Sequence, residues 1–278
     1  MCYNHLMLID THCHLHDREF FTAEQAEEMI QRAHTARVEK IICIGTSHED
    51  SLAAREFASK HDNIYWTYGI HPENVNSYRQ LEYDFLGTGS ARPVVTGEPP
   101  LATSVVTSGA PQKVYSQLPV AIGEVGLDYH YPDHNREAQI RLFEQMLQLA
   151  SDNDLPVSFH VREAFQDFFP VVANFPKVRG VVHSFTDSRK VLKRILNETD
   201  FYVGVNGLAT YSTLPTPPLE RILLETDAPF LTPEPFRGII NEPAHVSDIA
   251  NWLAAKLGSE FKIIEKETTK NGRKLFRI

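Results

Sequence analysis

Histidine and carboxylate side chains stand at the ends of several short apolar runs in this sequence. The first are His12 and His14, in the stretch "LIDTHCHLHD". Alternate side chains of an extended strand share a face, so these two imidazoles would project together while Cys13 faces the other way. Two histidines at a strand end can present nitrogen ligands to one metal ion, although histidine pairs also occur in surface turns.

Later apolar runs end in residues of the same kind. Glu124 lies near the end of "PVAIGEVG", His160 ends "LPVSFH", His183 follows "RGVV" and Asp227 follows "LLET". One such group behind a buried strand can be a satisfied core residue, but six from five strands are hard to explain in that way. Four imidazoles and two carboxylates suit Zn²⁺, Mn²⁺ or Mg²⁺, and a set this large suits two ions bridged by Glu124.

A pair of divalent ions at this place would support hydrolysis. The ions would clamp a substrate oxygen and lower the pKa of a bound water, as the hydrolysis of phosphate esters or amides requires. We expect Asp227 to hold one ion and to accept the proton from that water.

Eight apolar, β-branched runs recur along the chain and predict buried parallel strands. They span residues 6–10, 39–45, 63–69, 119–126, 155–160, 179–184, 200–207 and 221–226. Amphipathic segments such as 22–38 and 135–153 predict helices between them, with a capping box at Thr22 and Gln25. The alternation predicts an α/β fold, a (β/α)8 TIM barrel, whose active site lies at the carboxyl ends of the strands. An open doubly wound sheet is the competing architecture, but no GxGxxG motif follows the first strand.

Residues 87–112 interrupt this alternation. The segment is rich in Gly, Pro, Ser and Thr and has no hydrophobic period. It predicts a flexible insertion between the third and fourth strands, with a lid or binding loop as the alternative. We see no domain boundary and no internal repeat, so residues 1–278 are expected to form one domain.

The composition favours a cytoplasmic protein. Its 27 basic and 36 acidic side chains give a net charge of -9, which argues against binding nucleic acid by broad electrostatics. A nucleic-acid substrate is still compatible, because bound cations supply positive charge locally. Three cysteines without CxxC spacing fit a reducing compartment. We find no apolar run near the roughly 20 residues of a membrane span and no signal-peptide pattern.

The order of the motifs resembles that of the TatD family of metal-dependent deoxyribonucleases, which lies within the amidohydrolase-like hydrolases. The motifs run from Leu8 to Phe276 and are "IDTHCHL", "YGIHPE", "GEVGLDY", "LPVSFHVREA", "GVVHSFT", "LLETDAPFLTPEPFRG", "NEPAHV" and "NGRKLF". The resemblance implies a (β/α)8 barrel and 3′-5′ exonuclease-type cleavage of DNA with divalent metals. It further implies two ligand sets that share one residue: His12, His14, Glu124 and Asp227 for the first ion, and Glu124, His160 and His183 for the second.

Three further residues are candidates for contact with a phosphate. His71 in "YGIHPE" is assigned to the scissile phosphate or to proton transfer, unless it only packs the turn before Pro72. Arg162 is placed to donate a pair of hydrogen bonds to a phosphate, with an ordinary surface ion pair as the alternative. Arg237 in "PFRG" is a further phosphate contact.

The remaining residues of interest surround the predicted ligands. Tyr129 and Tyr131 are candidates for base stacking, against the alternative that they only pack. Asp10 is expected to orient a ligand histidine. His16 stands where the family usually has aspartate, and we do not expect it to bind metal.

We therefore predict a metal-dependent hydrolase that cleaves DNA phosphodiesters, a 3′-5′ exonuclease acting on single-stranded ends. Hydrolysis of an ester or amide at the same site, such as deacylation of a D-aminoacyl-tRNA, is the alternative. A metal-binding barrel without catalysis is the third possibility. We expect neither membrane association nor an obligate protein partner.

Overall fold

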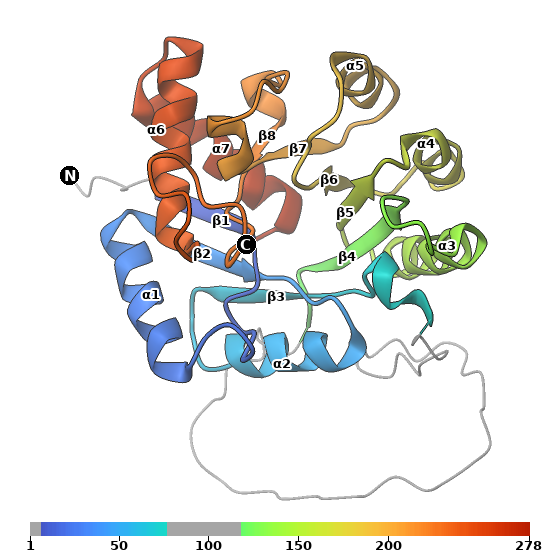
Figure 1. The fold of residues 1–278 in the computed structure, drawn as a ribbon, viewed down its shortest axis with the longest axis horizontal. Coiled ribbons are helices and arrows are strands. Elements are labelled where there is room, and N and C mark those ends of the chain that lie inside the picture. Colours follow the sequence, from blue (N-terminus) through green and yellow to red (C-terminus); the bar gives the residue numbers. More distant parts are fainter. Residues whose placement is uncertain (1–6, 77–117) are drawn as a thin grey trace, which may run out of the picture.

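The computed structural model describes residues 7–76 and 118–278, and there the chain forms the predicted (β/α)8 barrel (Figure 1). Eight strands lie in one sheet in chain order, and each pairs in parallel with the next. They are β1 (Leu8–Cys13), β2 (Val38–Cys43), β3 (Ile64–Tyr68), β4 (Ala121–Asp128), β5 (Val157–Arg162), β6 (Gly180–Val182), β7 (Tyr202–Val205) and β8 (Ile222–Leu224). The backbone N–H of Asp227 donates to the His12 carbonyl at 2.8 Å, which brings the segment after β8 against β1 and nearly closes the barrel.

Helices cover the outside of the strands (Figure 1). They are α1 (Ala23–Thr35), α2 (His48–Ala58), α3 (Arg136–Asp152), α4 (Phe165–Ala173), α5 (Arg189–Glu198), α6 (Val246–Leu257) and α7 (Phe261–Phe276). On α3 the buried side chains include Phe143, Met146 and Leu147, at the three- and four-residue spacing that puts one apolar face against the sheet. The capping box before α1 is present, because Thr22 and Gln25 each accept a backbone hydrogen bond from the other.

The first strand extends further than its apolar run predicts. We expected it to end at Asp10, but β1 continues through His12 to Cys13, which pairs with Cys43 of β2. Polar residues fit inside this strand because His12 faces the centre of the barrel mouth, where other polar groups meet it. Cys13 lies in the wall, with its Sγ atom 3.7 Å from the Ile42 carbonyl.

A glycine allows β4 and β5 to approach each other beside the site. Gly126 has a φ of +150°, in a region that residues with a side chain rarely adopt. A Cβ atom on Gly126 would lie 2.0 Å from the His160 carbonyl oxygen. The close pairing of the two strands at His160 therefore requires glycine here.

Two expectations stay predictions. Residues 87–112 lie outside the described residues, so the predicted insertion is untested. Within residues 7–76 and 118–278, no helix combines the length and the apolar character needed to cross a membrane. The cytoplasmic location inferred from the cysteines is not tested by that finding.

Candidate metal centre

The six side chains predicted to bind metal lie together at the carboxyl ends of the strands. Each is buried or half-buried. They come from β1 and the residue after it, from β4, from β5 and from the segments after β6 and β8: His12, His14, Glu124, His160, His183 and Asp227.

Glu124 is at the centre of this group. Its Oε2 atom lies 3.5 Å from His12 Nε2, while its Oε1 atom lies 2.7 Å from His160 Nδ1 and 3.0 Å from His183 Nε2. Burial alone would raise the pKa of Glu124, but the surrounding imidazoles, His183 foremost, hold that pKa well below its usual value. Glu124 is therefore an ionised carboxylate whose two oxygens face different histidines.

Asp227 joins the two histidines of the first strand. Its Oδ1 atom lies 3.5 Å from the Nε2 atoms of both His12 and His14. Burial opposes ionisation of Asp227, yet the adjacent His14 and the nearby His183 and His12 lower its pKa. This carboxylate is also ionised, and it faces the same side of His12 as Glu124 does.

Hydrogen bonds on the outer ring nitrogens orient His12 and His14. His14 Nδ1 lies 3.0 Å from the Ile44 carbonyl, which can only accept, so the proton of the neutral ring is on Nδ1. His12 Nδ1 lies 3.3 Å from the Ser158 hydroxyl. In both rings the Nε2 atom faces Asp227, and in His14 that atom carries a lone pair available to a cation.

Two buried carboxylates that the sequence analysis did not single out lie beside the other pair of histidines. Asp128 Oδ2 lies 2.8 Å from His160 Nε2 and orients that ring, and Glu225 Oε1, which accepts from the Ser184 backbone N–H, lies 3.5 Å from His183 Nδ1. Asp128 is four residues after Glu124, within the same strand. Alternate strand residues share a face, so this spacing could have indicated a second carboxylate on the inner side of β4.

The donor set fits divalent metal ions. His12 Nε2 is buried and, within the part of the chain that the structure describes, has no hydrogen-bond partner. That nitrogen belongs to two groups of ligand atoms that each lie within 4.8 Å of one another, one with Glu124 and His183 and one with His14 and Asp227. A cation between these atoms would satisfy the unpartnered nitrogen and neutralise the carboxylates, and imidazole with carboxylate suits Zn²⁺ and Mn²⁺.

His71 lies at the edge of the same group. Its Nε2 atom is 3.8 Å from Glu124 Oε1, and its ring centroid is 4.3 Å from that of His160. Its Nδ1 atom accepts from the Glu73 backbone N–H at 3.3 Å, so Nε2 carries the proton. Burial and the neighbouring His160 lower the pKa of His71 to about 3. The residue is therefore a neutral N–H donor at the metal centre.

The two arginines predicted to contact phosphate each lie against a tyrosine ring. The Arg162 guanidinium is 5.7 Å from the Tyr131 ring centroid. The Arg237 guanidinium lies 4.1 Å from the Tyr211 ring centroid. Both arginine side chains are exposed at the barrel mouth and stay candidates for phosphate contact.

Tyr129 is packed between neighbouring side chains. Its hydroxyl donates to Asp167 at 2.8 Å, and its ring stacks on His134 with the centroids 4.7 Å apart. These contacts account for the ring and the hydroxyl by packing, the alternative to base stacking, and stacking on a base stays a prediction.

Two residues of the first strand segment have roles other than ligation. Asp10 accepts from the backbone N–H groups of His12 and Thr226, and from the Thr226 hydroxyl at 2.6 Å. We expected Asp10 to orient a ligand ring, and it instead ties the backbone of β1 to the segment just before Asp227. His16 Nε2 lies 2.9 Å from Asp50 Oδ1, and His16 is absent from the ligand groups formed by the described residues.

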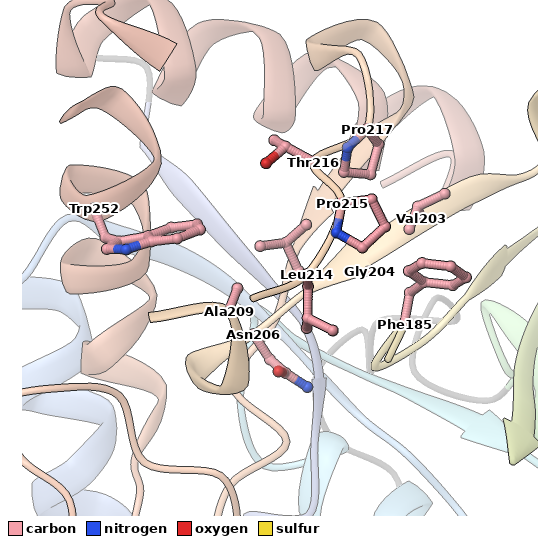
Figure 2. Close-up of a pocket in the computed structure, with 11 residues that line it drawn as sticks. Phe185, Val203, Gly204, Asn206, Ala209, Leu214, Pro215, Thr216, Pro217 and Trp252 are labelled. Atoms are coloured by element: carbon pink, nitrogen blue, oxygen red, sulfur yellow. The ribbon is translucent and has the colours of Figure 1, made fainter. Parts of the chain in front are cut away.

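A hollow beside β7 lacks the side chains for this chemistry. Phe185, Leu214, Pro215 and Trp252 line it, and its polar side chains are Asn206 and Thr216 (Figure 2). Neither polar side chain is ionisable, so the metal centre is the better candidate for catalysis.

Comparison with known proteins identifies the family. The profile of the family described as TatD related DNase matches residues 9–277. The chain belongs to the TatD family. Like other TatD proteins it is a metal-dependent hydrolase, and the ionised carboxylates and oriented imidazoles of the barrel mouth are its candidate metal ligands.

Individual TatD relatives cover almost the whole chain. An uncharacterised metal-dependent hydrolase of Bacillus subtilis, YabD, is 33% identical over 98% of this chain and 100% of its own length. The 3′-5′ ssDNA/RNA exonuclease TatD of Klebsiella pneumoniae is 30% identical over 91% of this chain and 92% of its own. The crystal structure of YJJV, a TatD homologue from Escherichia coli, has a TM-score of 0.80 at 26% identity and covers 98% of both chains.

Proposed function

We propose that this TatD protein cleaves phosphodiester bonds of DNA from the 3′ end of single strands, with two divalent metal ions. The observation that carries the proposal is the position of Glu124, whose two oxygens face two different groups of histidines. A bridging carboxylate is the usual link between two catalytic ions that act together on one phosphate. The name of the Klebsiella pneumoniae relative and that of the family support the choice of nucleic acid.

The ligands divide into two sets around Glu124. His12, His14 and Asp227, whose ligand atoms form one close group, would hold the first ion together with Glu124. His160 and His183, which both lie within 3.0 Å of Glu124 Oε1, would hold the second. Divalent ions bound there would supply positive charge for a phosphate and would lower the pKa of water. Zn²⁺, Mn²⁺ and Mg²⁺ all remain compatible with this donor set.

Two side chains would handle the proton and the phosphate. Asp227 is ionised and lies beside both first-strand histidines, so its carboxylate is placed to take the proton from the attacking water. His71 keeps its proton on Nε2 and is neutral, so it is placed to donate a hydrogen bond to a phosphate oxygen. Arg162 and Arg237 stand further out, where exposed guanidinium groups would meet neighbouring phosphates.

A nuclease assay tests this proposal. Single-stranded DNA labelled at its 5′ end should be shortened stepwise from the 3′ end in the presence of Mg²⁺ or Mn²⁺, and EDTA should stop the reaction. The same preparation should be offered D-aminoacyl esters and a double-stranded oligonucleotide. Cleavage of the esters without cleavage of any DNA would refute the nuclease proposal.

A further inference from the structure

An exposed pair of aromatic rings lies beside the metal centre. Phe230 follows β8 and is 48% exposed, and Phe20 follows β1 and is 42% exposed. Their ring centroids are 5.3 Å apart at an interplanar angle of 81°, an edge-to-face contact. The Phe230 ring centroid is also 6.3 Å from that of His14, a candidate metal ligand.

The backbone that carries Phe230 is held firmly although its ring is exposed. The Phe230 N–H donates to the Asp227 carbonyl at 2.8 Å, and the buried Asn241 side chain donates to the Phe230 carbonyl at 2.6 Å. The same Asn241 amide donates to the Thr226 carbonyl at 2.9 Å. The backbone at Phe230 is thus fixed relative to Asp227 before any substrate arrives, so only the side-chain torsions of the ring have to be ordered on binding.

We propose that Phe230, in edge-to-face contact with Phe20, is the surface on which an unpaired nucleobase next to the scissile phosphate stacks. This inference rests on the proposed function and adds what selects the substrate: the exposed flat face of a base. Bases inside a duplex have both faces covered by neighbouring pairs, so the ring favours single strands and frayed ends. Both DNA and RNA bases present such a face.

The charge of the protein favours stacking as a source of affinity. A net charge of -9 provides no broad attraction for a phosphate backbone. Stacking of a base on an aromatic side chain contributes affinity and accepts any base, because every base has a π face. An aromatic ring on this fixed backbone, next to the ligands, would hold the end of a strand in place without a basic surface.

The test combines a change in the ring with a change in the base. Phe230→Ala, Phe230→Trp and the control Ile263→Ala should be compared with the wild type on single-stranded oligonucleotides. Ile263 lies on α7 and is 47% exposed, similar to Phe230. Its replacement by alanine therefore removes a comparable exposed apolar side chain away from the barrel mouth. Each oligonucleotide carries either natural bases or one abasic residue, placed in turn at the two terminal positions.

We expect one abasic position to lower kcat/KM of the wild type about 5- to 140-fold, the effect of losing one stacked base. Phe230→Ala should lower kcat/KM for the natural strand by a similar factor. This variant should cleave the abasic strand only slightly more slowly than the natural one. Phe230→Trp should keep the wild-type preference, and Ile263→Ala should behave as the wild type. With EDTA present, 2-aminopurine at the same position should be quenched by the wild type and not by Phe230→Ala.

Each other outcome overturns the inference in a distinguishable way. An equal abasic penalty in the wild type and Phe230→Ala would show that the base stacks elsewhere. Unchanged cleavage by Phe230→Ala, with altered self-association in sedimentation, would show that the rings form a protein contact. A wild type that cleaves neither DNA nor RNA with metal bound would instead refute the proposed function, and this inference with it.

Discussion

The His160 ring is held between two carboxylates, with Nε2 2.8 Å from Asp128 Oδ2 and Nδ1 2.7 Å from Glu124 Oε1. Asp128 is fixed in turn, because its Oδ1 atom accepts from the His130 backbone N–H at 2.9 Å. A proton retained on Nε2 by Asp128 leaves Nδ1 as the nitrogen that faces Glu124 and the rest of the ligand group. Asp128 therefore sets both the rotation of the ring and the nitrogen that it offers.

Replacing Asp128 is expected to weaken metal binding although the residue is outside the six predicted ligands. Asp128→Ala should lower the affinity for Zn²⁺ or Mn²⁺ about 10- to 100-fold, as measured by calorimetry with chelator-treated protein. Asp128→Asn should lose less, because the amide oxygen can still accept from His160 Nε2. Asp152→Asn, an exposed change on α3, is the control. Equal affinities in all four proteins would contradict the role given to Asp128.

Removing the charge of Glu124 should abolish the carboxylate bridge between the two sets of metal ligands. Glu124→Gln keeps the size of the side chain, but it has a single acceptor oxygen and no charge. We expect a lower metal content by elemental analysis and a fall in hydrolysis of at least about 10²-fold, as for loss of a main electrostatic element. Circular dichroism should show that the barrel is intact. Full metal content with an unchanged rate would exclude a bridging role for Glu124.

The convergence of the ligand side chains was predictable because it depends on topology. Parallel strands of a barrel bring their carboxyl ends to one mouth, whatever residues they carry. An ionisable residue at the end of an apolar run is therefore enough to place Glu124, His160 and His183 near one another. Metal ligation itself stays a prediction, since the structure tests only the positions of these side chains.

The features that the sequence did not predict depend on contacts between distant segments. The contact of Phe20 with Phe230 joins the loops after β1 and β8, which are neighbours only because the barrel closes. The ring nitrogen that His160 offers to a metal depends on its contact with Asp128, which belongs to the neighbouring strand β4. The extension of β1 to Cys13 depends on pairing with β2, which an apolar run cannot indicate.

Metal binding should weaken as the pH falls. Burial opposes protonation of His160, but Asp128 and Glu124 outweigh it and raise the pKa of the metal-free ring to about 8. An ion must displace that proton below pH 8, so affinity should fall about 10-fold per pH unit for each proton released. Chelator competition between about pH 6 and pH 9 measures the slope. A constant affinity from about pH 6 to pH 8 would contradict the raised pKa.

A change at the first helix should alter stability without altering the site. Thr22→Ala removes the acceptor for the Gln25 N–H at the start of α1. Loss of such a cap costs about 1 kcal/mol, which for a chain of this size lowers the melting temperature by about 2–4 °C. Metal affinity should be unchanged. A fall in both quantities would mean that α1 is coupled to the metal centre.

His71 should act on the substrate rather than on the metal. His71→Ala removes a neutral N–H donor 3.8 Å from Glu124 Oε1, and we expect kcat to fall about 10²-fold or more while metal content stays at the wild-type level. Because the pKa of His71 is about 3, its ring is neutral across the working range, and the pH profile above about pH 5 should keep its shape. Loss of a bound ion in His71→Ala would instead identify the residue as a ligand, in the group that it forms with Glu124 and His160.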